Sequence, residues 1–559
     1  MNRTMGRIEE LQHKTTVNII EKANLIWSIS DKLVGTYKPH EYGNVVLPMC
    51  IIKRFSDNLA TTKSSNNSIY NTSNLTFEGL LSDPDNIADN FRDYLKHFSS
   101  NVIDVIEKFD FDKEITKLDK NGILFNVISE FCTEKAYMGA DKISSVDMGY
   151  IFEELVRRFS EGFDEQAGAH FTPRDIVYLM TEVLIAPHRK KIASKGISTS
   201  IYDMAMGTSQ MLDCLSERLR EIYPKAQLTE YGQELNEQTF AIAKSNMLVR
   251  GRNADNLKLG NTLNDDKFKD CKFDYIISNP PFGIEWKNEM KDVREENSLG
   301  DKGRFGAGLP SLGDSQQLFV LNGVSKLKDN GRIAIIQNGS PLFKGDAGSG
   351  ESNIRGYLLE HDWLEAIIQI PKFMFYNTGI ATYIWVVSKD KSVERTGKVQ
   401  LIDASKCCIK RRKNIGYKRN EFDDICIGLI MKAYKTFADG SYTKGDLVVE
   451  SRVKDNEDFK FRKITVKYPS DTQTDKKRKT EKETEIIPWK EDVQEYLDKN
   501  ILPFHPRATI VENQTKIGYE IPFTREFFKY VRLESSKNII SRLKELEAKD
   551  IELMNKILG

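Results

Sequence analysis

The chain has 559 residues, which is enough for two or three domains that each bury a core of their own. Its 82 Lys and Arg residues balance its 82 Asp and Glu residues, so no net field draws the whole molecule to nucleic acid. If the protein acts on DNA, a local basic face or a partner must supply much of the affinity.

Cysteines, histidines and apolar runs exclude further classes of protein. The seven cysteines are scattered and form no CxxC pair, which is typical of reduced thiols in a cytosol. The histidines show no metal-ligand spacing, so we expect no metal site. The amino terminus leads into polar sequence and no apolar run reaches membrane-spanning length. We therefore expect a cytoplasmic protein with no membrane partner.

Residues 1–160 are predicted to form an N-terminal helical domain. Apolar residues recur three and four positions apart over 17–33, 86–109, 122–132 and 147–159. No pattern in this block carries chemistry, so we interpret it as a packing or docking domain.

The character of the chain changes at Phe171-Thr172-Pro173-Arg174, which begins an amphipathic helix. Thr172 suits the N-cap and Pro173 the first helical turn. Such a helix start offers free N–H groups to an anion, although the local pattern alone favours a simple capped helix.

A strand, a turn and a helix follow over Ser200–Ala205 and Met206–Leu212. This order is typical of the cradle for a nucleotide-like cofactor, but Gly207 is its single glycine and the pattern alone is weak. The second strand, Leu228–Glu234, ends about 20 residues later in an acid that can accept both ribose hydroxyls of an adenosine.

A third segment, Asn256–Leu263, precedes the most informative stretch of the chain. Asn261 in it is placed to contact an adenine edge, and a turn-forming asparagine is an equal alternative.

The stretch from Phe273 to Gly283 is a short apolar run that stops at Asn279-Pro280-Pro281-Phe282. The run is typical of a strand buried on both faces, and two prolines cannot continue its ladder. Polar and aromatic groups therefore lie at the carboxyl end of a buried strand, where ligands bind in open α/β sheets.

These residue types favour methylation of an exocyclic amine, whose lone pair is delocalised into a ring. The Asn279 side-chain oxygen and the Pro280 carbonyl can accept its N–H groups, and Phe282 offers a face for the base. A proline-rich turn without chemistry is the alternative for the stretch alone. Adenine in DNA, bases in ribosomal RNA and a glutamine amide in proteins remain open as substrates.

The chain continues with a long glycine-rich and charged loop over 298–313, which we expect to be mobile. Further strands are predicted at 331–336, 364–370 and 381–387. From about 165 to 390, seven strands alternate with helices, which predicts one doubly wound α/β sheet.

Beyond 390 the pattern weakens. Lys410–Lys413 is the densest basic cluster, and it suits phosphate contact and a solvated loop equally. Asp471–Glu485 is predicted to be a charged linker. The terminal helix carries a heptad-like apolar stripe, which either packs on the chain's own body or docks on another subunit. The stripe consists of Ile539, Leu543, Leu546, Leu553 and Ile557.

Taken together, these motifs resemble the modification (methyltransferase) subunits of type I restriction–modification systems over nearly the whole length. The resemblance rests on Phe171-Thr172-Pro173-Arg174, the turn after Asp203, Glu234 in Gln-Glu-Leu-Asn and the Asn279–Phe282 loop. It implies a seven-stranded doubly wound S-adenosylmethionine-dependent methyltransferase sheet, an N-terminal helical domain and a mostly helical C-terminal tail. The expected parts are 1–160, a catalytic domain over 161–395, and 396–559 with the charged linker and a terminal docking helix.

The resemblance also assigns residues by their match to the family's motifs. It implies that an adenine flipped from double-stranded DNA is held by the catalytic residues Asn279, Pro280, Pro281 and Phe282. The expected binding residues for S-adenosyl-L-methionine are Ala169, His170, Phe171, Thr172, Pro173, Arg174, Asp203, Gly207, Thr208, Ser209, Gln210, Glu234 and Asn261.

The family further implies partners. Two modification subunits are expected to flank one specificity subunit, which reads the DNA, and a restriction subunit joins them. The turn departs from the family pattern, with Met204 for proline and with Ser209 and Gln210 for glycines. A methyltransferase-fold scaffold with weak or no activity is therefore one alternative, and an amino-methyltransferase acting on RNA or protein glutamine is another.

Overall fold

The computed structural model describes residues 18–59, 69–161, 172–189, 192, 198–468, 481–530 and 534–558. The chain divides into two compact units, residues 1–521 and 522–559. Within the described residues no helix is both long enough and apolar enough to cross a lipid bilayer.

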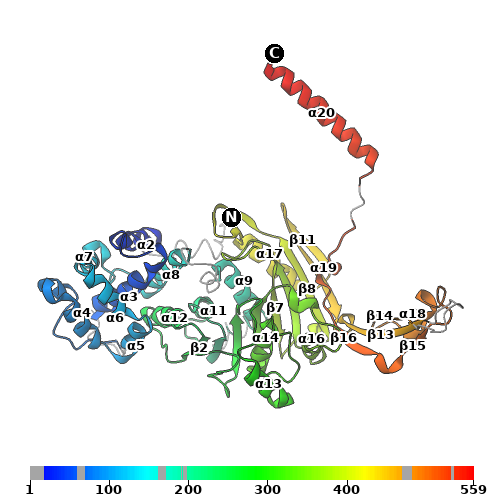
Figure 1. The fold of residues 1–559 in the computed structure, drawn as a ribbon, viewed down its shortest axis with the longest axis horizontal. Coiled ribbons are helices and arrows are strands. Elements are labelled where there is room, and N and C mark those ends of the chain that lie inside the picture. The colour runs from blue at the N-terminus through cyan, green and yellow to red at the C-terminus, as the bar shows by residue number, and fades with distance from the viewer. Residues whose placement is uncertain are drawn as a thin grey trace. The chain divides into compact units, whose positions relative to one another are not determined.

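Helices build the amino-terminal part of the first unit, as the sequence predicts (Figure 1). Their apolar positions point inward and share one core with the sheet domain that follows, because Phe55, Phe91 and Leu155 are buried in the same cluster as Ile201 of the first strand. The helices are α2 (Ile19–Ser28), α3 (Gly43–Leu59), α4 (Ile87–Lys96), α5 (Ser100–Lys108), α6 (Phe111–Lys120), α7 (Leu124–Phe131) and α8 (Ser145–Glu161).

The centre of the first unit is a mixed sheet of ten strands in the order β11-β12-β8-β6-β7-β5-β4-β1-β2-β3. All seven predicted strands occur as one block in it, and β7 alone in that block runs antiparallel to its neighbours β5 and β6. They are β1 (Ser198–Asp203), β2 (Gln227–Glu234), β3 (Leu257–Leu259), β4 (Phe273–Ser278), β5 (Leu327–Gln337), β6 (Leu364–Ile370) and β7 (Thr382–Ser388).

The strand order reverses between β1 and β4. From β1 the chain moves outward through β2 to β3, and it then returns to β4 on the other side of β1 and continues to β5. Such a reversal opens a crevice at the carboxyl ends of the two central strands. Asp203 ends β1 there, and Asn279 directly follows β4.

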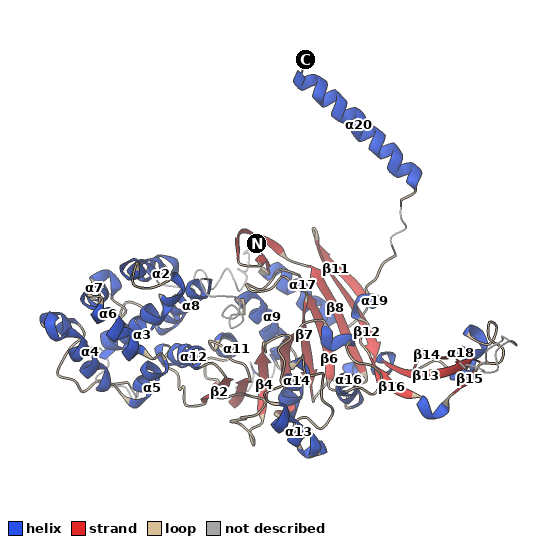
Figure 2. Ribbon diagram, in the orientation of Figure 1, coloured by secondary structure: helices blue, strands red, loops and turns tan. Residues whose placement is uncertain are grey.

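Helices cover both faces of this sheet (Figure 2). On one face α9 (Arg174–Ile185) packs between α11 (Gln210–Ile222) and α17 (Asp424–Thr436). On the other, α14 (Gln316–Ser325) lies against β5 so closely that a Cβ on Gly323 would meet Ile333 at 3.0 Å. The remaining helices of the sheet domain are α12 (Glu237–Val249), α13 (Met290–Ser298), α15 (Ser340–Phe343) and α16 (Gly350–Glu360).

The expectation of a mostly helical C-terminal tail is wrong. Strands β8, β12 and β11 extend the seven-stranded block to ten, because β8 adds parallel to β6 and the next two continue antiparallel. The sheet therefore crosses the expected boundary at 395/396, and the three-part division of the chain stays a prediction. These strands are β8 (Lys398–Lys406), β11 (Gly440–Lys444) and β12 (Leu447–Asp455).

A second, smaller sheet also replaces expected helix or linker. Its strands β13 and β14 pair antiparallel over eight residues, and Ile464, Val466 and Ile487 form a separate small core. The predicted linker at 471–485 therefore ends inside β14, and its first part lies outside the described residues. The strands are β13 (Lys460–Tyr468), β14 (Glu481–Pro488), β15 (Thr509–Ile510) and β16 (Lys516–Tyr519), and α18 (Val493–Asn500) accompanies them.

The loop over 298–313 is packed, contrary to the expectation of a mobile segment. Phe305 is fully buried, and the Arg304 guanidinium donates to the carbonyls of Thr262 and Leu263 and to Glu296. The loop sequence shows no periodic apolar pattern, but Arg304 and Phe305 are enough to attach it to the segment after β3.

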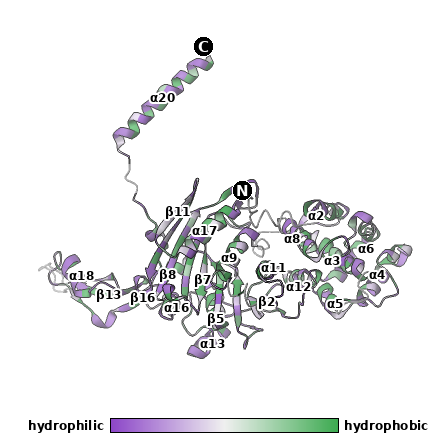
Figure 3. Cartoon of the chain, turned by 180° about the vertical axis from the view of Figure 1, so that it is seen from behind, coloured by the Kyte–Doolittle hydropathy of each residue, from purple (hydrophilic) through white to green (hydrophobic). Residues whose placement is uncertain are grey.

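The second unit contains α19 (Phe523–Glu526) and α20 (Ser536–Leu558). Hydrophobic and hydrophilic residues alternate along α20, as its heptad-like stripe predicts (Figure 3). Whether the stripe docks on another subunit stays a prediction.

Candidate active site

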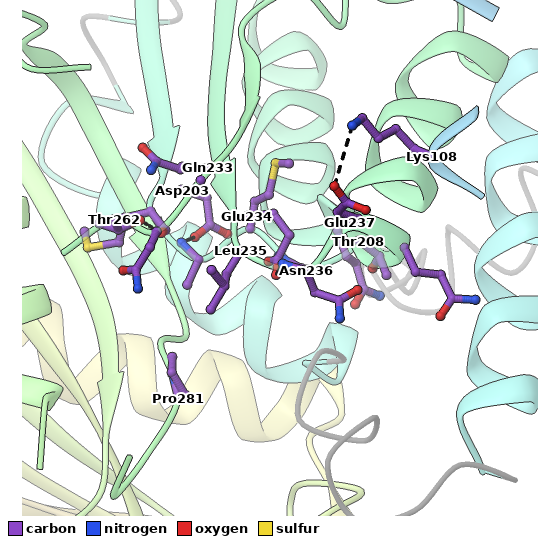
Figure 4. Close-up of a pocket in the computed structure, with 18 of the residues that line it drawn as sticks. Lys108, Asp203, Thr208, Gln233, Glu234, Leu235, Asn236, Glu237, Thr262 and Pro281 are labelled. Atoms are coloured by element: carbon purple, nitrogen blue, oxygen red, sulfur yellow. Dashed lines mark hydrogen bonds and ion pairs between the residues drawn. The ribbon is translucent and has the colours of Figure 1, made fainter. Parts of the chain in front are cut away.

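A cavity of about 860 Å³ lies at the reversal point between β1 and β4, a size suited to a nucleoside-containing ligand (Figure 4). Predicted site residues from five separate segments line it. They are Thr172, Asp203, Gly207, Thr208, Gln210, Glu234, Asn261, Asn279 and Pro281.

One polar side-chain atom of Asn279 makes a hydrogen bond within the chain, and the other has no partner among the described residues. Its Nδ2 donates to Thr172 Oγ1 at 2.9 Å, while its Oδ1 is buried without a partner among the described residues. An orphaned buried acceptor costs about 1–3 kcal/mol, so its persistence at the cavity wall indicates a place for a donor from outside the chain.

The aromatic ring of the predicted catalytic loop, Asn279–Phe282, is also held in place. Phe282 is half-buried and meets Phe375 edge to face, with ring centroids 6.4 Å apart and planes at 87°. Phe375 belongs to the segment that connects β6 to β7, which therefore backs the catalytic loop.

Asp203 is a fully buried acid on the cavity wall. Burial raises its pKa to about 7, against the hydrogen bonds that its carboxylate accepts from Ser278 and from the backbone of Ala205. Its Oδ1 takes both bonds, and its Oδ2 has no partner among the described residues. A cationic or hydrogen-donating ligand would therefore favour the ionised form.

Glu234 connects the turn after β1 to the end of β2. One carboxylate oxygen accepts from Gly207 N at 3.0 Å and the other from Asn236 N at 2.9 Å, so each retains capacity for a further donor. Gly207 has φ of +52°, a left-handed conformation that glycine adopts without strain.

Ser209 and Gln210 stand in the turn where the family pattern has glycine. Ser209 adopts the left-handed conformation with φ of +65°, and Asn246 Nδ2 lies 3.3 Å from its hydroxyl. The side-chain amide of Gln210 is buried in the cavity wall, and neither its oxygen nor its nitrogen has a partner among the described residues. Gln210 thus adds an orphaned donor and acceptor to the site.

Asn261 forms a turn, one of its two predicted roles. Its Oδ1 accepts from Leu263 N at 2.9 Å and its Nδ2 donates to Glu289 at 2.8 Å. The residue nevertheless lines the cavity, so a contact with a ligand stays a prediction.

Five predicted residues lie outside the cavity lining, and three are not described. Arg174 points away from the cavity, donates to Glu153 of α8 at 2.7 Å, and so ties the helical part to α9. Pro173, Ser209, Pro280 and Phe282 are not among the residues that line the cavity. Ala169, His170 and Phe171 lie outside the described residues. No cluster able to hold a metal ion occurs among the described residues.

Sequence reasoning missed two parts of the wall. Leu235, directly after Glu234, is a 65% exposed leucine that lines the cavity. Its place beside an acid that is predicted to bind a ribose was a signal readable from the sequence. The helical part also contributes Asn44, Lys108, Asp110, Lys113 and Glu114. Nothing local in those segments predicts that they meet a site formed by residues much later in the chain.

Comparison with known proteins agrees with this geometry. Residues 144–476 match the family described as N-6 DNA Methylase, and residues 22–131 match the HsdM N-terminal domain. The chain is 26% identical over 432 residues to the type I restriction enzyme MjaIX methylase subunit of Methanocaldococcus jannaschii, covering 71% of this chain and 74% of the relative. It is 30% identical over 292 residues to the HindI methylase subunit of Haemophilus influenzae, covering 51% and 58%.

A solved structure shares the fold. The type I restriction–modification methyltransferase subunit from Streptococcus thermophilus superposes with a TM-score of 0.63 at 22% identity, covering 79% of this chain and 96% of that one.

Proposed function

The chain belongs to the N-6 DNA Methylase family, and from that membership and the site we propose that it methylates N6 of adenine in double-stranded DNA, with S-adenosylmethionine as methyl donor. We propose further that it acts as the modification subunit of a type I restriction–modification complex, the role named for its relatives.

One observation carries the proposal: an asparagine oxygen, buried and without a partner among the described residues, faces a nucleoside-sized cavity at the carboxyl end of β4. The description of the matched family names no target base. An amine with two N–H groups, such as N6 of adenine, is the donor that this acceptor suits.

The residues present fit S-adenosylmethionine. Its cationic groups suit the wall that Asp203 and Glu234 make acidic, its ribose hydroxyls suit Glu234, and its methionine end suits the orphaned amide of Gln210. When bound, the cofactor supplies an activated methyl group on a sulfonium. No general base of unusual strength is needed for such a transfer.

The chain's own residues orient and polarise the base. Asn279 Oδ1 accepts one N–H of the amine, and the Pro280 carbonyl is proposed to accept the other, which draws the lone pair out of conjugation. Thr172 keeps the Asn279 amide in one orientation, and Phe282 stacks on a base that has left the duplex.

The proposed partners follow from the family and the charge balance. A chain with 82 positive and 82 negative residues has no overall field for DNA, so a specificity subunit that reads the sequence fits its electrostatics. We propose two copies of this chain beside one specificity subunit, with a restriction subunit added, and the stripe of α20 as a docking element.

The test is methylation of plasmid DNA in cells that express this chain with a specificity subunit encoded beside it. N6-methyladenine, detected by mass spectrometry of digested plasmid, is the expected product. Plasmid from cells that express the Asn279→Ala variant serves as the matched control. Unmethylated plasmid from the parent pair would refute the proposal, and an absence of heat on titration with S-adenosylmethionine would favour an inactive scaffold.

A further inference from the structure

A basic hairpin made of β9 (Ile409–Ile415) and β10 (Lys418–Glu421) carries charges that the fold does not use. Lys410, Arg412 and Lys413 are exposed, and none has an ion-pair or hydrogen-bond partner for its side chain among the described residues. Arg411 differs, since it pairs with Glu421 of the same hairpin. Three like charges within four residues repel one another, which a fold tolerates where an anion binds.

The hairpin is anchored to the helix that begins at the active site. Lys418 is buried, and its Nζ lies 3.0 Å from Asp175 Oδ2 and 3.0 Å from the Met374 carbonyl. Asp175 also accepts from Phe422 N at 2.9 Å. Asp175 lies in the first turn of α9, three residues after the Thr172 that holds Asn279.

The hairpin is also attached to the segment that backs the catalytic loop. Tyr417 N donates to the Tyr376 carbonyl at 2.8 Å, and Arg419 N donates to the Phe373 carbonyl at 2.9 Å. Phe375, between these two acceptors, contacts Phe282. The backbone of the hairpin is therefore fixed relative to the catalytic loop from two sides.

We propose that the β9–β10 hairpin contacts phosphates of the DNA strand beside the base that the Asn279 loop receives. This inference rests on the proposed function, because it needs DNA at that loop. A polyanion fits this surface, because Lys410, Arg412 and Lys413 of β9 offer three separate cations that are unpaired among the described residues. Such contacts position the duplex without reading its sequence.

The experiment measures binding of the full-length chain to a fluorescein-labelled 30-base-pair duplex of arbitrary sequence by anisotropy, over a range of salt concentrations. The variant K410Q/R412Q/K413Q leaves the anchor Lys418 intact. Each lost phosphate contact lowers the slope of log affinity against log salt by about 0.9, so the slope should fall by about 2–3.

A matched triple, K432Q/K435Q/K444Q, removes three exposed lysines of α17 and β11 from the same unit. This control should keep the parent slope, and both triples should keep the parent melting temperature and affinity for S-adenosylmethionine. An unchanged slope in the hairpin triple, or an equal fall in the control triple, would overturn the inference.

Failure of this inference can be separated from failure of the proposed function. A parent chain that binds duplex DNA and methylates plasmid, with a hairpin triple of unchanged slope, refutes the hairpin alone. If the parent chain expressed with its specificity subunit leaves plasmid unmethylated, the proposed function itself is refuted.

Discussion

Thr172 offers a direct test of how the site holds Asn279, the proposed catalytic asparagine. From sequence it is expected to bind the cofactor, whereas in the structure its hydroxyl accepts the 2.9 Å hydrogen bond from Asn279 Nδ2. Thr172→Val keeps a branched side chain at this buried position and removes the hydroxyl. The Asn279 amide then loses the contact that fixes which of its atoms faces the cavity.

The expected loss follows from the value of one hydrogen bond. A neutral bond contributes about 0.5–1.5 kcal/mol net, and about 1.4 kcal/mol corresponds to a tenfold change in rate. Thr172→Val should therefore slow methyl transfer by roughly 2- to 13-fold at saturating cofactor. Affinity for S-adenosylmethionine should change less than about twofold, because the lost bond is made within the chain.

The assay is single-turnover transfer of tritiated methyl groups to DNA, with calorimetric titration of the cofactor beside it. Thr172→Ser keeps the hydroxyl oxygen and should recover most of the rate. The reasoning is refuted if Thr172→Val weakens cofactor affinity tenfold while the single-turnover rate stays at the parent value. That result would instead support the cofactor-binding role.

Three further predictions address the site and the core. Asn279→Ala should abolish methyl transfer yet leave calorimetric affinity for S-adenosylmethionine nearly intact, and an equal loss of both would contradict the assigned role. Burial raises the pKa of Asp203 to about 7, above its unfolded value near 3.8, so the stability that this group contributes is present below about pH 4 and is lost as pH rises through 7. The melting temperature should therefore fall between pH 5 and 8 by less in Asp203→Asn than in the parent, and parallel curves would disprove this. Arg332 and Glu365 form a fully buried pair at 2.6 Å, so Glu365→Ala should lower the free energy of unfolding by about 3–5 kcal/mol in urea titration, and a loss below about 1 kcal/mol would show that the pair is dispensable.

The local sequence pattern was sufficient to predict the strands that carry the site. Leu364–Ile370 matches β6 in both bounds, and the other six strands of the block lie within a few residues of their predicted ranges. Continuous apolar runs between turn signals specify buried parallel strands, because both faces of such strands are covered. The catalytic loop was equally readable, since two prolines after a buried run leave few other structures.

The C-terminal region was misread because its strands lack that pattern. β9 consists largely of basic residues, and β13 and β14 are rich in charge, so neither shows a buried run or a clear alternation. Pairing with partner strands makes them strands: β9 pairs with β10 in a hairpin, and β13 pairs with β14 on one side and with β16 on the other.

The sequence by itself determined the class of the fold, the order of its motifs, the residue that ends β2 and the proline-rich loop that stops β4, because each depends on neighbours along the chain. Tertiary structure alone decided which side chains meet. In the tertiary structure Thr172 accepts a hydrogen bond from Asn279, and Arg174 donates to Glu153. Lys108 and Lys113 of the helical part line the cavity. The contact between Thr172 and Asn279 joins residues 107 positions apart. The packing of one shared core chooses such partners, and no local periodicity encodes it.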